Sequence, residues 1–230
     1  MLIRMPRFPK RAALALVLAC AVLPVNASRA NEACGRRCVE TDLACNAAVA
    51  LCELKLHAFD VYMHQIDAGQ PRHALPPSYQ DILRAHYPNT DLAQVRFAFS
   101  DQQPLDNATT DCRYIYFNDA TYVATVRDAG PNEKWRWLLH ELTHAEQCAS
   151  GGREKYALRW WSELEAAVRD SNETIDLAQT TEQLAKQLQE LYVRVHAAMP
   201  MEQAADAKAE AVLAELQRCC IAPDGRPIQR

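Results

Sequence analysis

Residues 138–147 read LLHELTHAEQ and lie in an apolar stretch that begins near Glu133 and contains no glycine or proline to interrupt a helix. His140 and His144 are four residues apart, so on a helix their imidazoles project from the same face, one turn apart. Both rings can then bind one Zn²⁺, while Glu141 is placed to take the proton of a zinc-activated water. The motif predicts a zinc site for peptide hydrolysis with Glu141 as the general base.

A catalytic zinc site needs a third protein ligand, and no histidine follows His144 until His196. The motif helix is predicted to end at a turn over residues 150–152, and a second helix is predicted over residues 153–170. If that helix folds back antiparallel, it carries Glu163 or Glu165 over the imidazoles. Only one of the two can be the ligand, because residues two apart point to different sides of a helix.

The remaining pattern is mainly helical. Two short runs of β-branched and aromatic residues, at 95–99 and 113–117, predict strands, and residues 101–111 are expected to be a polar connection. Apolar residues at helical spacing, together with good helix formers, predict helices over residues 33–67, 78–85, 133–149, 153–170, 177–199 and 201–219. The expected fold is therefore mainly α (α+β): a zinc-peptidase-like core with a small β-sheet and a motif helix, plus helical N- and C-terminal extensions.

Residues 1–30 are typical of a secretory signal peptide, with basic residues before an apolar run and a small-residue cleavage site at Ala27 or Ala30. Lipoprotein processing at Cys20 is the alternative. We expect four segments: a signal peptide (1–30), a cysteine-rich N-terminal helix (31–70), a metallopeptidase-like core (71–172) and a C-terminal helical extension (173–230). The mature chain is expected to lack a transmembrane segment and to be exported, either periplasmic or extracellular.

The charge balance gives no indication of a nucleic-acid partner. Without the first thirty residues, which hold five basic and no acidic side chains, the chain carries 20 basic and 29 acidic residues, a formal charge of −9. Nucleic-acid binding proteins usually show the opposite excess. We therefore expect a protein or peptide substrate, and the oligomeric state stays open.

Eight cysteines remain in the mature chain, and their even number in an exported protein predicts disulfide bonds. The first four share one face of the expected N-terminal helix and would need partners on other segments. Cys219 and Cys220 are candidates to bind two of them, while Cys112 and Cys148 could bridge the second strand to the motif helix. The full set is Cys34, Cys38, Cys45, Cys52, Cys112, Cys148, Cys219 and Cys220.

Three stretches together resemble the core-domain family of metallopeptidases associated with extracellular contractile injection systems, over about residues 78–170. They are residues 87–96, residues 114–117 (YIYF) and the motif at 138–147. That family is similar to compact gluzincins, in which the third zinc ligand is a Glu on the helix after the motif helix, commonly with Ala three and Asp four residues later.

On this pattern, the resemblance implies zinc ligation by His140, His144 and Glu163, because Ala166 stands three residues after Glu163. Ala167 stands where the Asp would be, which removes a hydrogen-bond partner of one zinc histidine. The resemblance also implies that the strand at 114–117 is an edge that pairs with an extended substrate.

The sequence thus favours an exported zinc-dependent metallopeptidase with Zn²⁺ as its cofactor. The alternative is a disulfide-stapled envelope scaffold or binding protein that retains a structural or inactive zinc site. A donor that stabilises the substrate carbonyl is also expected, and Tyr156, Tyr192 and His196 are the candidates.

Overall fold

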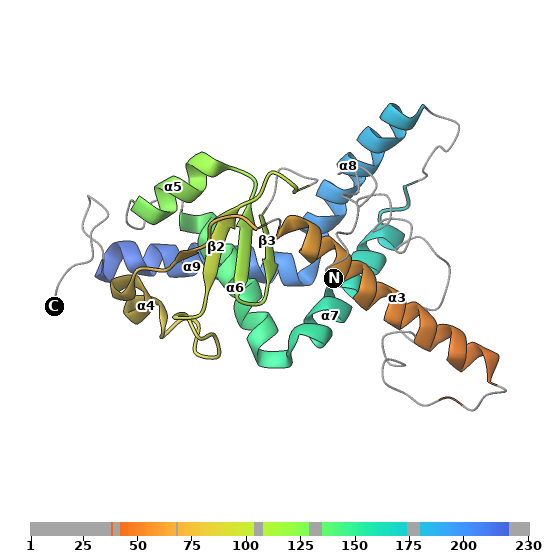
Figure 1. The fold of residues 1–230 in the computed structure, drawn as a ribbon, viewed down its shortest axis with the longest axis horizontal. Helices are drawn as coiled ribbons and strands as arrows, with labels where there is room; N and C mark the ends of the chain where they lie inside the picture. The colour runs from red at the N-terminus through yellow and green to blue at the C-terminus, as the bar shows by residue number, and fades with distance from the viewer. Residues whose placement is uncertain are drawn as a thin grey trace, which may run out of the picture. The chain divides into compact units, whose positions relative to one another are not determined.

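The computed structural model describes residues 38, 42–67, 69–103, 108–128, 135–173 and 180–220, so the expected signal peptide lies outside the described residues. The described chain is mostly helical with one small mixed sheet, which confirms the expected α+β class (Figure 1). In chain order the elements are α3 (Leu43–Ile66), β1 (His73–Ala74), α4 (Pro77–Leu83), β2 (Arg96–Phe99), β3 (Ala108–Asp111), β4 (Tyr114–Phe117), α5 (Ala120–Asp128), α6 (Trp135–Gly151), α7 (Arg153–Asp170), α8 (Thr181–Ala198) and α9 (Pro200–Cys219).

These elements belong to two compact units. One contains α3 up to Gln65, α7 from Ala157, and α8; the other contains the sheet, α4, α5, α6 and α9. The expected division at residue 173 therefore differs from the grouping in the structure, because α9 joins the unit that holds the sheet and the motif helix.

The sheet has the strand order β1-β2-β4-β3, in which β2 and β4 are parallel and the two outer pairs are antiparallel. Both predicted strands, β2 and β4, are present. Their apolar side chains Phe97, Ile115 and Phe117 are fully buried, which explains why their sequence signal is strong. The expectation that residues 114–117 form an edge is wrong, because β4 lies between β2 and β3.

The edge beside β4 is formed by β3, which lies in a stretch that we expected to be a polar connection. A two-residue turn at Cys112 and Arg113 joins β3 to β4, with Asp111 paired to Tyr114. Cys112 has a φ of 54°, a left-handed conformation that a non-glycine residue seldom adopts. Its Sγ lies at disulfide distance from that of Cys148 on α6, as the sequence suggested, and this link holds the hairpin against the motif helix.

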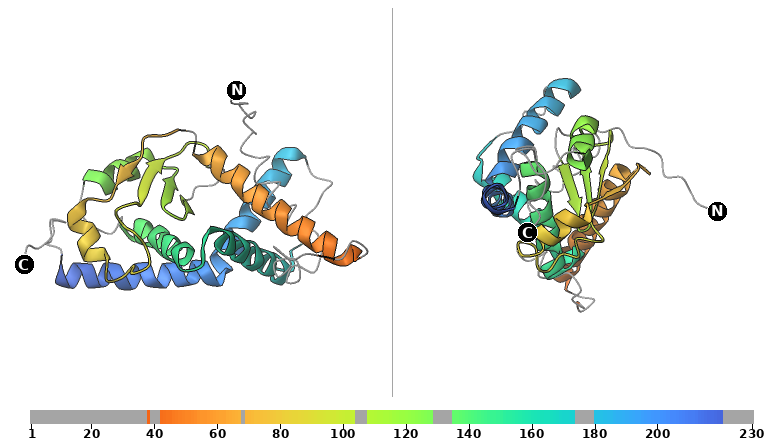
Figure 2. Two further views of the ribbon diagram at one scale, coloured as in Figure 1. Left: turned by 60° about the horizontal axis from the view of Figure 1, so that its bottom comes forward. Right: turned by 90° about the vertical axis from the view of Figure 1, so that its left-hand side faces the viewer.

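Helix α6 is the centre of its unit. It packs against β3 on one side and against α9 on another, and Figure 2 shows α9 running alongside it. Trp135, Leu138, Leu139 and Leu142 of α6 are completely buried in the apolar core. Ala205 and Ala209 of α9 are also fully buried, and side chains this small permit a close approach of the two helices.

The other unit contains a buried ion pair between α3 and α7. Lys55 Nζ lies 2.6 Å from Glu165 Oε1, and the side chains are 0% and 5% exposed. The indole N–H of Trp161 donates a hydrogen bond to the Lys55 carbonyl at 3.0 Å. Both contacts link the middle of α3 to α7.

Two cysteine expectations are corrected by the structure. Cys38 lies at disulfide distance from Cys45, because α3 begins only at Leu43 and Cys38 precedes it rather than sharing its face. The neighbours Cys219 and Cys220 lie at disulfide distance from each other and not from the N-terminal cysteines. Cys52 is also disulfide-bonded, and Cys34 lies outside the described residues.

Candidate metal centre

Three side chains from two helices converge at the face between α6 and α9. The Nε2 atoms of His140 and His144 lie 3.0 Å apart, and each lies 3.1 Å from Oε2 of Glu202. The four-residue spacing on α6 aligns the two imidazoles, while Glu202 is placed by the first turn of α9. Within the described residues, His140, His144 and Glu202 are the His, Cys, Asp or Glu side chains that lie close enough together to hold a metal ion.

The geometry of this group suits zinc. In a tetrahedral site with bonds of about 2.0–2.1 Å, two ligand atoms lie about 3.3–3.4 Å apart. The three ligand atoms here are separated by 3.0 to 3.1 Å, so a shift of a few tenths of an ångström would produce the tetrahedral spacing. Two imidazole nitrogens and one carboxylate oxygen are also a donor set typical of catalytic zinc, which leaves a fourth position for water.

Each histidine has a second partner that orients its ring. Nδ1 of His140 lies 3.0 Å from Oδ1 of Asp206, and Nδ1 of His144 lies 2.9 Å from Oε1 of Gln147. Such partners leave the Nε2 atoms for a metal and keep the rings from rotating. Asp206 is in turn 3.5 Å from a guanidinium nitrogen of Arg136, one helical turn before His140.

Glu202 fulfils the sequence pattern that was expected for the third ligand. Ala205 follows it by three residues and Asp206 by four, whereas Glu163 is followed by Ala166 and Ala167. The Asp that is missing after Glu163 is thus present after Glu202, and it bonds to His140.

Glu163 is not part of the metal-capable group. It accepts a hydrogen bond from Arg159 at 2.7 Å on its own helix, and Glu165 is held by Lys55. Both lie in the unit formed by α3, α7 and α8, whereas the two histidines and Glu202 lie in the other unit. Ligation by Glu163 would require α7 to return over the imidazoles, but the helix that packs on α6 in this unit is α9.

Glu141 is buried beside the histidines, with a side chain held by the edge strand. Thr110 Oγ1 donates a hydrogen bond to Glu141 Oε2 at 2.6 Å. Burial raises the pKa of Glu141 above its ordinary value, although the neighbouring His140, His144 and Thr110 act in the opposite direction. A raised pKa brings a carboxylate closer to the range in which it can both accept and release a proton near neutral pH.

The histidines carry raised pKa values. Burial acts to lower the pKa of His144, but Glu202, together with Glu141 and Gln147, more than offsets it and raises the pKa to about 9. Burial likewise opposes protonation of His140, and its pKa is nevertheless raised because Glu202 and Glu141 are near. A metal ion would therefore displace protons from this group when it binds.

Of the three expected carbonyl-stabilising donors, Tyr156 belongs to the same unit as the histidines. Its ring centroid lies 6.2 Å from that of His144. Tyr192 and His196 lie on α8 in the other unit, where their ring centroids are 5.2 Å apart.

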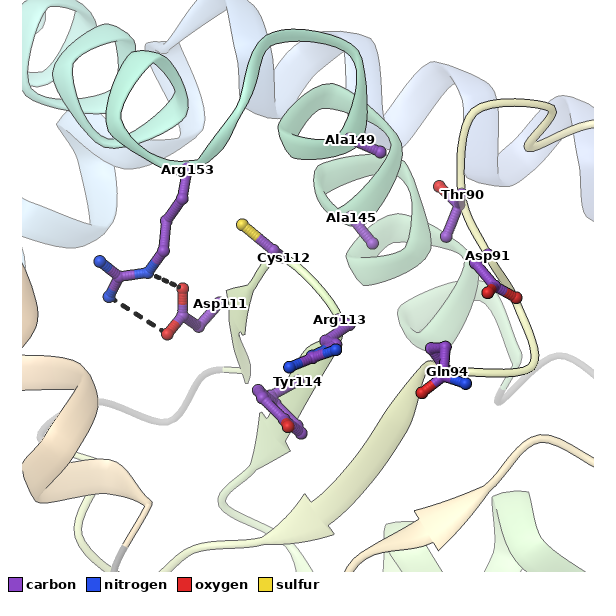
Figure 3. A pocket seen from close by; sticks show the side chains of 10 residues that line it. All are labelled: Thr90, Asp91, Gln94, Asp111, Cys112, Arg113, Tyr114, Ala145, Ala149 and Arg153. Atoms are coloured by element: carbon purple, nitrogen blue, oxygen red, sulfur yellow. Dashed lines mark hydrogen bonds and ion pairs between the residues drawn. The ribbon is translucent and has the colours of Figure 1, made fainter.

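A cavity of about 580 Å³ lies on another part of the same unit, against α6 and the β3–β4 turn (Figure 3). Ala145 and Ala149 form its wall on the helix. An ion pair between Arg153 and Asp111, with Nε and Oδ1 2.6 Å apart, borders it on the other side (Figure 3). Its lining includes none of the three metal-capable side chains.

No family model, curated protein or solved structure matches the chain. Among the helices of the described residues, none combines the length and apolar character needed to cross a membrane.

Proposed function

We propose that this protein is an exported zinc-dependent metallopeptidase, with His140, His144 and Glu202 as zinc ligands and Glu141 as general base. The observation that carries the proposal is the three-atom group formed by the two Nε2 atoms and Glu202 Oε2, directly beside a buried carboxylate. Glu202 replaces Glu163 in this assignment. The resemblance of the motif region to gluzincin-like peptidases supports the same chemistry.

Bound Zn²⁺ would supply Lewis acidity, which lowers the pKa of water and polarises a peptide carbonyl. The side chains of the protein transfer the protons and orient the zinc ligands. Glu141 accepts the proton of the attacking water and returns it to the leaving amine, while Asp206 and Gln147 keep the two imidazoles aligned. Tyr156, near His144, is the donor that we propose for the developing carbonyl oxygen.

The substrate in this proposal is an extended peptide that pairs with β3. This strand is one of the two edges of the sheet, it packs against α6, and its Thr110 contacts the proposed base. Edge pairing uses main-chain hydrogen bonds and tolerates many side chains. The cysteine pairs at disulfide distance support an oxidising, exported location.

Zinc content and proteolysis of the purified mature protein test the proposal. The wild type should bind one zinc per chain and cleave an unfolded protein such as reduced casein. Glu141→Gln should keep the zinc and lose cleavage, because it removes only the base.

Glu146→Gln is the matched control, since Glu146 lies on the same helix but accepts its hydrogen bonds from Asn89 and Thr90. It should retain both properties. Zinc binding without cleavage in the wild type would favour the alternative of a structural zinc site in an envelope scaffold. Absence of zinc would contradict both readings.

A further inference from the structure

Gln147 connects one proposed zinc ligand to the helix turn that carries another. It lies on α6 three residues after His144, and its side chain makes two hydrogen bonds. Oε1 lies 2.9 Å from His144 Nδ1, and Nε2 donates to the Met201 carbonyl at 3.2 Å. Met201 directly precedes Glu202 in the first turn of α9.

The orientation of this amide follows from its second partner. A backbone carbonyl can only accept a hydrogen bond, so the NH₂ group of Gln147 must face Met201. The amide oxygen then faces His144, and because this oxygen can only accept, the proton must be on Nδ1 of His144. In a neutral ring the lone pair is consequently on Nε2, the atom that faces His140 and Glu202.

We propose that Gln147 is a positioning residue of the metal centre. It selects the metal-binding tautomer of His144 and ties that ring to the turn of α9 that presents Glu202. This inference rests on the proposed zinc site. A role in helix packing alone would make the amide oxygen dispensable, whereas a positioning role requires an acceptor at this place.

Zinc dissociation constants of four purified variants of the mature protein separate these roles. Gln147→Met removes both hydrogen bonds at similar side-chain length, and Gln147→Asn shortens the amide so that it cannot reach both partners. Gln147→Glu keeps an acceptor for His144 Nδ1. The control Gln203→Met changes an exposed glutamine next to Glu202.

Competition against a zinc-binding dye at fixed pH gives the affinities, and circular dichroism of the zinc-free proteins establishes that each variant is folded. We expect Gln147→Met and Gln147→Asn to bind zinc about 10–100-fold more weakly than the wild type, as is typical when the partner of a ligating histidine is lost. Gln147→Glu should bind zinc more tightly than Gln147→Met, because it keeps the acceptor for His144 Nδ1 and loses only the hydrogen bond to Met201. Gln203→Met should be unchanged.

Three results would contradict the positioning role, and they differ in what they imply for the zinc site. Unchanged affinity in the folded Met or Asn variant would overturn the positioning role and leave the zinc site intact. A loss of zinc affinity in Gln147→Glu as large as in Gln147→Met would show that an acceptor for His144 Nδ1 is not required. That result would also overturn the positioning role. A wild-type protein that binds no zinc would overturn the proposed function and this inference together.

Discussion

Replacing Glu202 with glutamine should remove most of the zinc affinity, because the charged oxygen within 3.1 Å of both Nε2 atoms is lost. Structural zinc sites with four ligands bind with about 10–16 kcal/mol, which is about 2.5–4 kcal/mol per ligand. Each 1.4 kcal/mol is about tenfold in affinity, so the loss of one ligand corresponds to roughly 60-fold to 700-fold weaker binding.

The pH of the measurement matters for this variant. Glu202 is the main group that raises the pKa of His144 to about 9, with smaller contributions from Glu141 and Gln147, so the wild type must release a proton to bind zinc at pH 7. That cost amounts to about a hundredfold in apparent affinity, and it is smaller in Glu202→Gln, which lacks the main group that raises the pKa of His144. The difference in zinc affinity between the two proteins is therefore smaller at pH 7. At pH 9 most of the cost has gone, and the full loss should be visible.

The assay is a zinc titration at pH 9 in a chelator buffer, with Glu163→Gln as the matched control. We expect the loss for Glu202→Gln alone. Equal affinities of Glu202→Gln and wild type, or a larger loss for Glu163→Gln, would contradict the assignment of Glu202 as the third ligand.

Three further predictions concern the protonation of His144, the buried ion pair of Lys55 and Glu165, and the link between Cys112 and Cys148. The folded-state pKa of His144, about 9, lies above the value of about 6.5 expected in the unfolded chain. The stabilisation from its protonation is therefore complete below pH 6.5 and lost as pH rises toward 9. Thermal denaturation of zinc-free protein should show this decline, and a flat profile would contradict it. Lys55→Met should lower the free energy of unfolding in urea by about 3–5 kcal/mol, since it leaves the Glu165 carboxylate buried and unpaired. Addition of Glu165→Leu should recover much of this loss. An unchanged free energy of unfolding in Lys55→Met would contradict the prediction. Replacing Cys112 and Cys148 by alanine opens a link between residues 36 apart, and should lower the free energy of unfolding by about 3–4 kcal/mol. An unchanged unfolding midpoint would count against that bond.

The elements with strong periodicity could be predicted from the sequence. Helices α6, α7 and α9 have regular apolar faces, and β2 and β4 are apolar because they are interior strands. Strand β3 was missed because its residues, ATTD, are small and polar, as an edge strand permits. Helix α5 follows β4 after a short polar turn and was also missed.

The candidate site could be predicted in part. The spacing of His140 and His144 is a local property of one helix, so the motif identified two members of the metal-capable group. The identity of the third metal-capable residue depends on which helix packs against α6. Glu202 lies 58 positions after His144 in the sequence. Local pattern could still have indicated Glu202, because the Glu, Ala and Asp spacing is complete there and incomplete at Glu163.

The position of bound zinc tests directly whether His140, His144 and Glu202 form the metal site. Crystals of the mature protein grown with zinc, measured at the zinc absorption edge, would locate the ion by its anomalous signal. We expect one strong peak at about 2.0–2.2 Å from Nε2 of His140, Nε2 of His144 and a carboxylate oxygen of Glu202. A peak coordinated by Glu163 instead, or no peak at the two histidines, would contradict it.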